Sequence, residues 1–204
     1  MIIINQRDLK SKTQKFFLSS DRFKKHNIRR FIMESKFKRI LYGGDYNPNQ
    51  WPEEVWKEDM RIFKDAHINT ATINVFSWAK IQPSENVYDF SYLDIDMLSK
   101  ENYDIVLATS TAALPAWMVK KYPEVMSTDY EGRHHTFGGR HNACPNSLVY
   151  QKYARALAFK LAERYGKNEH VTCWHINNEY GAECYCDNCK KAFRVWLQDK
   201  YHTL

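Results

Sequence analysis

The sequence is poor in glycine and proline and contains no long apolar run. It has 7 glycines and 6 prolines among 204 residues, which excludes collagen-like and low-complexity chains. No stretch approaches the roughly 18 consecutive apolar residues of a membrane span, and the N-terminus lacks the basic, apolar and small-residue order of a secretion signal. With 44% hydrophobic and 26% charged residues, the composition is that of a globular protein, which we expect to be cytoplasmic and without a membrane partner.

Positive charge is concentrated at the N-terminal end of the chain. Residues 1–40 hold 12 Lys/Arg and 3 Asp/Glu, so residues 41–204 hold 30 − 12 = 18 basic and 24 − 3 = 21 acidic residues. A nucleic-acid-binding interpretation would therefore depend on the N-terminal segment alone, and we expect no nucleic-acid partner. We predict that 1–38 is a basic extension, poorly ordered or derived from a misplaced start, and that 39–204 forms one domain.

From residue 39 onward, strand-like and helix-like segments alternate. The pattern predicts strands over 39–47, 70–76, 103–111 and 171–178, and helices over 52–68, over 91–102, from near Ser147, and over 187–202. Alternation of this kind is typical of a parallel α/β sheet with right-handed crossovers. No glycine-rich phosphate loop follows the first strand, which disfavours a dinucleotide-binding sheet. We therefore predict a (β/α)8 TIM-barrel type of fold with only about the first four βα units, and unpaired edges on the first and fourth strands.

An amide and a carboxylate follow the fourth predicted strand. In barrels of this kind catalytic groups lie just past the carboxyl ends of the strands, which is where Asn178 and Glu179 occur. A carboxylate at this place can protonate a leaving group while the neighbouring amide holds a hydroxyl. Position alone leaves a second interpretation open, in which the glutamate caps the next helix or pairs with an arginine.

Four of the five cysteines have the spacing of a metal site. Cys184, Cys186 and Cys189 form a C-x-C-x2-C run, and Cys144 lies in the loop before the third long helix. Four thiolates can close a tetrahedral zinc site that is structural because no ligand position stays open. Disulfides or free thiols are the alternative. Cys173 lies in the middle of a strand, so we interpret it as a small buried hydrophobe.

Aromatic residues, at 15% of the chain, gather near the predicted strand ends. Tyr46, Phe76, Trp78 and Trp117 could be platforms for the apolar faces of a sugar, or ordinary packing residues. Helical Trp56 and Trp196 are expected to pack in the core.

Long stretches of the sequence resemble glycoside hydrolase family 42, a family of bacterial β-galactosidases with a (β/α)8 barrel. The resemblance runs from about residue 41 to the last residue and includes "LYGGDYNPNQWPEEVWKEDM", "GRHHTFGGRHNACPNSLVYQ" and "CWHINNEYGAECYCDNC". It implies that 39–204 is the N-terminal half of a glycoside hydrolase barrel, that the substrate is a β-galactoside, and that the full-length enzyme is a homo-oligomer, specifically a trimer.

The resemblance also implies roles for individual residues. Glu179 would be the general acid/base of a retaining hydrolase, and Arg140 and Asn178 would bind the galactose. Residues matching the zinc cysteines of many members are Cys144, Cys184, Cys186 and Cys189. The family's nucleophile is a glutamate after strand seven, so this chain is expected to lack it and to be an incomplete β-galactosidase, a silent zinc- or sugar-binding fragment, or one part of a split enzyme.

Overall fold

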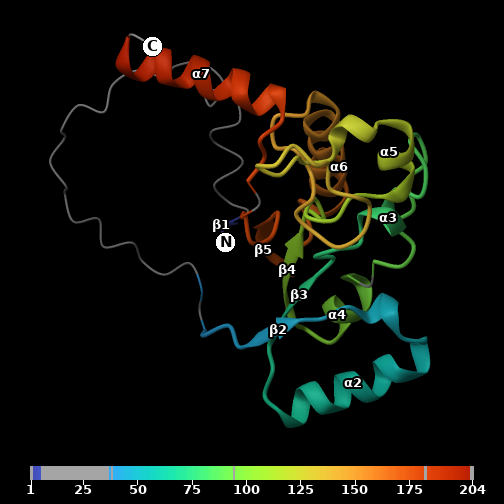
Figure 1. The fold of residues 1–204 in the computed structure, drawn as a ribbon. Helices are drawn as coiled ribbons and strands as arrows, with labels where there is room; N and C mark the ends of the chain where they lie inside the picture. Colours follow the sequence, from blue (N-terminus) through green and yellow to red (C-terminus); the bar gives the residue numbers. More distant parts are fainter. Residues whose placement is uncertain (1, 6–36, 38, 94, 182, 203–204) are drawn as a thin grey trace, which may run out of the picture.

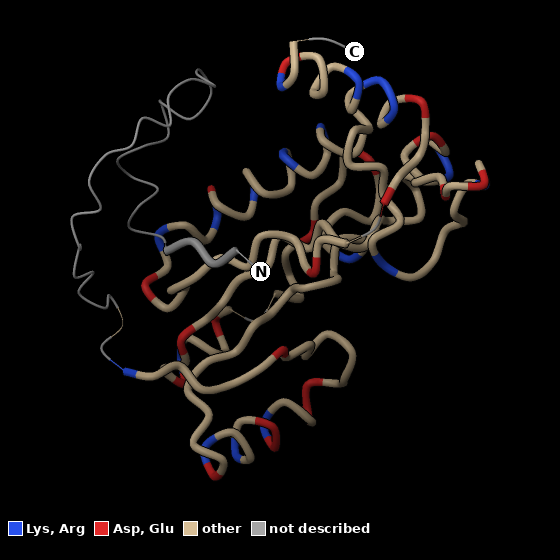
Figure 2. The backbone as a smooth tube through the Cα atoms, turned by 60° about the vertical axis from the view of Figure 1, so that its left-hand side comes forward, with Lys and Arg blue, Asp and Glu red and all other residues tan. Residues whose placement is uncertain are grey.

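A computed structural model gives the arrangement of the chain and describes residues 2–5, 37, 39–93, 95–181 and 183–202. Most of the basic segment 1–38 therefore lies outside the described residues, including the cluster of basic residues between 22 and 30. The proposed boundary near residue 38 stays a prediction. Along the described helices α2 (Glu53–Asp65) and α7 (Asp187–Tyr201), basic and acidic residues are interspersed (Figure 2).

Four parallel strands form the centre of the molecule. They are β2 (Gly43–Asp45), β3 (Thr70–Ile73), β4 (Asp104–Ala108) and β5 (Val171–Ile176), each at or within a strand predicted from the sequence. They pair side by side in chain order, with registers Asp45 to Thr72, Thr72 to Val106 and Val106 to Cys173. This is the sheet expected for the first four units of a barrel (Figure 1).

One edge of this sheet differs from the expectation. The segment β1 (Ile2–Asn5) pairs antiparallel with β5, in the register Ile2 to Ile176. The prediction of an unpaired edge on the fourth parallel strand was therefore wrong, because a strand far away in the sequence covers it. At the other edge lies β2, which pairs only with β3 among the described residues.

Helices connect and cover the strands. The four predicted helices are confirmed as α2 (Glu53–Asp65), α4 (Ile95–Lys100), α6 (Leu148–Tyr165) and α7 (Asp187–Tyr201). Short elements not anticipated from the sequence are η2 (Pro48–Gln50), α3 (Trp78–Ile81), α5 (Ala116–Lys121) and η3 (Pro123–Val125). The start of α6 has a clear cause, since the Ser147 side chain accepts a hydrogen bond from the Tyr150 backbone N–H.

The core lies between the sheet and the helices. On β3 and β4, Ala71, Ile73, Ile105 and Leu107 are buried in the cluster that also contains Leu157 of α6. The residues between them on each strand point to the opposite face, which is the inner face of the barrel. Polar groups and small side chains on that inner face are therefore the ones available to a site at its mouth.

Helix α7 extends away from the body (Figure 1) and has no buried residue. Trp196 on this helix is 49% exposed, so the expectation that it packs in the core was wrong. Its indole instead stacks on Phe193 of the same helix, with ring centroids 5.8 Å apart. In the described part of the chain, no helix is both long and apolar enough to cross a bilayer.

Candidate active site and metal centre

The carboxyl ends of the parallel strands share an uncommon backbone feature. Directly after β3, near the end of β4 and after β5, Asn74, Ser110 and Asn177 have φ values of 69°, 60° and 57°. Non-glycine residues adopt this left-handed region at an energetic cost, and such residues gather at functional sites. The strand ends are therefore built for a fixed geometry.

Hydrogen bonds between strands hold these three turns together. The Asn74 side chain donates from Nδ2 to the Ala108 carbonyl at 2.8 Å, and the Ser110 hydroxyl donates to the Asn74 carbonyl. On the next strand the Asn177 backbone N–H donates to Thr109 Oγ1 at 2.9 Å. The loop that begins at Asn177 thus starts from a position fixed by β3 and β4.

Glu179 lies on that loop, opposite Arg140. The two side chains form an ion pair with Nη2 and Oε2 2.9 Å apart, although their positions in the sequence differ by 39 residues. Glu179 itself has a left-handed φ of 41°. Its side chain is 64% exposed, so the carboxylate is open to a ligand at the mouth of the sheet.

The third predicted site residue, Asn178, directly precedes Glu179 in the chain and is buried to 8% exposure. On the strand below, His175 is 4% exposed, and the Asn178 side chain interacts with its ring. Burial lowers the pKa of His175, and the Asp45 carboxylate opposes that shift. The structure thus brings Arg140 and Glu179 into contact, which is the pairing with an arginine that the second interpretation of the sequence allowed, and Asn178 directly precedes Glu179.

The aromatic candidates separate into two groups. Tyr46 and Trp78 are buried, and the Trp78 indole N–H donates to Gln82 Oε1 at 2.8 Å, so both are packing residues. Trp117 packs against the core and donates to the Gln82 carbonyl. Phe76 differs, because it is 38% exposed and the Arg140 guanidinium lies 5.4 Å from its ring centroid. Only Phe76 of these four lies beside the ion pair.

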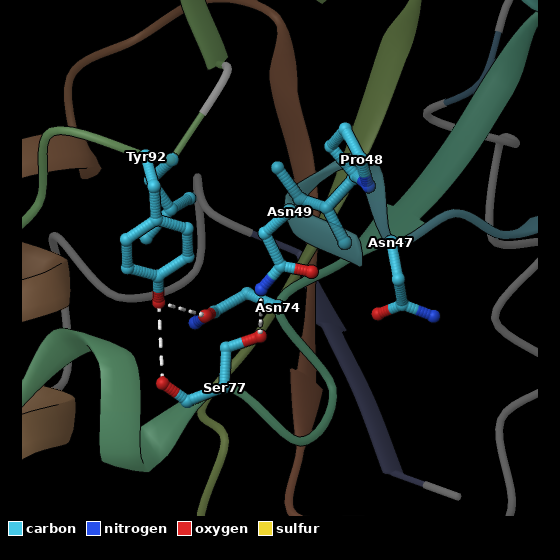
Figure 3. A pocket seen from close by; sticks show the side chains of 8 residues that line it. Asn47, Pro48, Asn49, Asn74, Ser77 and Tyr92 are labelled. Carbon is cyan, nitrogen blue, oxygen red and sulfur yellow. Dashed lines mark hydrogen bonds between the residues drawn. The ribbon is translucent and has the colours of Figure 1, made fainter. Parts of the chain in front are cut away.

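A small hollow lies at the ends of β2 and β3 (Figure 3). Its volume of about 10 Å³ matches a single water molecule. Asn49 donates from Nδ2 to Ser77 Oγ at 3.0 Å, and the Tyr92 hydroxyl donates to Asn74 Oδ1 at 3.2 Å. The Asn49 side-chain oxygen is buried without a hydrogen-bond partner among the described residues. The hydrogen bonds around this hollow hold the Asn74 turn in place. The hollow itself is too small for a sugar.

Four sulfur atoms form a cluster near the start of α7. The Sγ atoms of Cys144, Cys184, Cys186 and Cys189 all lie within 4.8 Å of one another, and all four thiols are free. Cys144 lies 3.5 Å from both Cys186 and Cys189, measured between sulfur atoms. The fifth cysteine, Cys173, is buried in β5 away from this group, which confirms its packing role.

This cluster fits a metal ion. A tetrahedral ion with metal–sulfur bonds of ~2.3 Å separates its sulfur ligands by ~3.8 Å, which lies within the observed range. Burial raises the pKa of Cys186, but the Cys189 backbone N–H and the neighbouring thiols outweigh it and lower that pKa to about 7. Asn146 Nδ2 donates to Cys189 Sγ at 3.2 Å, and the Thr128 N–H donates to Cys184 Sγ at 3.4 Å. Such outer bonds orient thiolate ligands.

Comparisons with known proteins agree on one family. Residues 45–204 match the family model Glyco_hydro_42, described as Beta-galactosidase. The chain is 57% identical to β-galactosidase LacZ of Lactobacillus acidophilus over 172 residues, covering 83% of this chain and 26% of the relative. It is 55% identical to β-galactosidase BgaP of Planococcus sp. over 176 residues, covering 85% and 26%.

Solved structures give the same result for the fold. The crystal structure of β-galactosidase from Bacillus circulans sp. alkalophilus superposes with a TM-score of 0.80 at 60% identity, covering 83% of this chain and 25% of that one. The parallel sheet and its helices are therefore part of an α/β barrel. The chain spans about a quarter of the length of the relatives it matches.

Proposed function

The chain belongs to the Glyco_hydro_42 family of β-galactosidases, and from this premise we propose that it carries the acid/base half of a retaining β-galactosidase active site. Glu179 is the general acid/base in this proposal, and Arg140 and Asn178 bind the galactose. The observation that carries it is the ion pair of Arg140 with Glu179 at 2.9 Å, directly after the carboxyl end of β5.

The chemistry follows from the position of the carboxyl group. Protonated Glu179 gives its proton to the glycosidic oxygen as the bond to the anomeric carbon breaks, and as a carboxylate it later takes a proton from the attacking water. Arg140 fixes the orientation of this side chain before the substrate arrives. Asn178, buried beside it, can hold a sugar hydroxyl through its amide.

A retaining mechanism needs a second carboxylate about 5–5.5 Å from the first. The resemblance assigns that nucleophile to a later strand of the barrel, whereas the described sheet contains four parallel strands. In our proposal, therefore, the described residues bind the galactose and protonate the glycosidic oxygen. The attack on the anomeric carbon depends on a carboxylate outside them.

We also assign the cysteine cluster a structural zinc ion held by Cys144, Cys184, Cys186 and Cys189. When bound, the ion ties the loop before α6 to the start of α7. Support comes from the sulfur geometry and from the hydrogen bonds to Cys184 and Cys189. Free thiols arranged for a metal favour a reducing compartment such as the cytoplasm, and we propose the homo-oligomer of the family for the complete enzyme.

Hydrolysis of a chromogenic aryl β-galactoside by the purified chain tests the proposal, with Glu179→Gln as the control for contaminating host enzyme. Hydrolysis by the unmodified chain that is lost in Glu179→Gln would mean that a nucleophile is available to this chain. No turnover together with galactose binding that requires Asn178 would identify a binding and protonating half-site. No turnover and no galactose binding would refute the proposal for this chain.

A further inference from the structure

The outer edge of β5 is covered by a strand whose direction does not fit a barrel. β5 pairs with β4 on one side and with β1 on the other, and only the pairing with β1 is antiparallel. In a barrel of alternating strands and helices, this edge belongs to a further parallel strand, which a right-handed helical crossover connects to β5. β1 therefore occupies the place of a parallel barrel strand.

The direction of β1 limits what it can contribute to the site. Parallel barrel strands bring their carboxyl ends to one mouth, where Glu179 follows β5. β1 places its amino end at that mouth, because Ile2 lies opposite Ile176, the last residue of β5. The residues that follow the carboxyl end of β1 thus start from the opposite end of the sheet. β1 closes the edge of β5 without adding a strand-end group to the site.

The cover that β1 provides is short and incomplete. β1 has 4 residues and β5 has 6, whereas a usual strand has about 5–6. The pairing ends with Asn5 opposite Cys173, so Val171 and Thr172 have no strand partner on this side among the described residues. Short edge strands limit unwanted pairing of sheets. A longer strand can pair first with Val171 and Thr172 and then displace β1.

Helix α7 provides a second, independent observation. It follows β5 in the chain and has the position of the crossover helix that leads to the next parallel strand. Such a helix packs its apolar side on the sheet. None of the residues of α7 is buried, and Phe193, Trp196 and Tyr201 contact one another on its exposed side. The helix thus has an apolar side suited to packing on a strand and helix that the described residues do not include.

We propose that the β5 edge and the apolar side of α7 form a docking surface for a second polypeptide, which supplies the next parallel strand and helix of the barrel, and that β1 is a displaceable cover of this surface. The partner pairs in parallel with β5, starting at Val171 and Thr172, and buries the aromatic residues of α7. Strand addition of this kind obtains affinity from main-chain hydrogen bonds and specificity from side chains. This inference concerns assembly and does not depend on the role of Glu179.

A reversible lock in the full 204-residue chain tests the displacement of β1. Asn5→Cys places a thiol opposite the native Cys173. Directly opposed Cα atoms of antiparallel strands lie about 4.5–5.5 Å apart, a separation that a disulfide can span. Mild oxidation with oxidised glutathione should join positions 5 and 173, which mass spectrometry of the unreduced peptides detects, and dithiothreitol should separate them. The matched control is Asn5→Cys/Cys173→Ala, which keeps the four clustered cysteines and cannot form this lock.

The partner used as a probe is the segment of β-galactosidase LacZ of Lactobacillus acidophilus that follows the region matched by this chain. Sedimentation velocity in the absence of substrate measures its association with each variant. We expect the unmodified chain and the reduced Asn5→Cys variant to bind it. The oxidised variant should bind about tenfold more weakly or less, because the lock removes the state in which the edge is open. The oxidised double variant should bind like the unmodified chain.

Several outcomes would overturn the inference. The absence of a cross-link between positions 5 and 173 would show that β1 does not cover β5. Equal binding of the partner by the oxidised and reduced Asn5→Cys variants would show that the partner does not use this edge. Absence of binding by every variant would show that the edge does not accept a barrel strand. Since no substrate is present, these outcomes are independent of the proposed acid/base role of Glu179.

Hydrogen exchange on the unmodified chain tests the same inference without a partner. The amides of β1 should exchange faster than those of β4, which lies between two parallel strands, because a displaceable cover opens locally. Equal protection of β1 and β4 would contradict the inference, since β1 would then be a fixed part of the sheet. Thermal unfolding of each variant checks that the fold is retained.

Discussion

Arg140 joins two strand ends, because its guanidinium lies 2.9 Å from Glu179 and stacks 5.4 Å from the ring of Phe76. Glu179 follows β5 and Phe76 follows β3, so the Arg140 side chain contacts residues at the ends of both strands. An exposed ion pair of this kind contributes only about 0–1 kcal/mol to stability. The main effect of this ion pair is therefore to orient the Glu179 carboxylate, and its effect on stability is small.

This relationship predicts a separation of binding from stability. Arg140→Lys keeps the charge but loses the planar fork that contacts Glu179 and Phe76 together. We expect galactoside binding to weaken about 10-fold or more, while the midpoint of thermal unfolding stays within about 2 °C. Ligand titration followed by NMR and thermal unfolding measure the two effects. An unchanged affinity would show that Arg140 does not organise the site.

The cysteine cluster predicts one bound metal ion per chain. Cys189→Ser should lower the zinc content, measured by mass spectrometry of the elements, from about one ion per chain to near zero, because a structural zinc site needs all four ligands. Removing zinc with a chelator should lower the midpoint of thermal unfolding, since the free energy of metal binding contributes to the stability of the fold.

Cys173→Ala is the matched control for this experiment. Cys173 is buried in β5 and is separate from the four clustered sulfur atoms. The variant should keep its zinc and lose some stability through the cavity it creates. Retention of zinc by Cys189→Ser, or its loss from Cys173→Ala, would contradict the assignment.

The sequence predicted the parallel sheet, and the positions of the candidate residues at its strand ends, for physical reasons. β-branched runs such as the one containing Thr70–Ile73, and cap residues such as Ser147, are local signals that the structure reproduces. Catalytic groups at strand ends follow from the topology, so Asn178 and Glu179 could be placed before their contacts were known.

Other features depend on contacts between distant segments, which no local pattern contains. The antiparallel pairing of β1 with β5 joins segments that are about 170 residues apart in the sequence. The position of Trp196 is a second case, because the helical pattern of α7 is amphipathic and yet its apolar side has no neighbour among the described residues that buries it.

The hydrogen bonds of the Glu85 carboxylate lead us to expect that the chain loses stability in acid. Its carboxylate accepts hydrogen bonds from Lys121, Tyr153 and Tyr122, which lower its pKa to about 2. A group whose pKa is depressed in the folded state contributes stability above its unfolded value of about 4.3, and that contribution is lost as the pH falls toward 2.

The variant Glu85→Gln should therefore be less stable than the unmodified chain at pH 7, and the difference should shrink between pH 4 and about 2. Urea unfolding at a series of pH values measures it. Glu163→Gln, on an exposed position of α6, is the control and should show no such convergence. A constant difference across the pH range would mean that the charge of Glu85 does not stabilise the fold.

The apolar side of α7 predicts self-association of the isolated chain. Phe193, Trp196 and Tyr201 are 57%, 49% and 58% exposed and contact one another on a helix without buried residues. Exposed apolar patches of this kind promote association, and the edge of β2, which has no partner strand on one side among the described residues, is a second surface that can associate. We expect sedimentation velocity to show oligomers whose fraction rises with protein concentration. The double variant Phe193→Lys/Trp196→Lys should shift the distribution toward the monomer, whereas Leu148→Lys, at an apolar residue of α6 that is even more exposed, at 80%, should not. A monodisperse monomer for the unmodified chain would show that α7 is covered in solution.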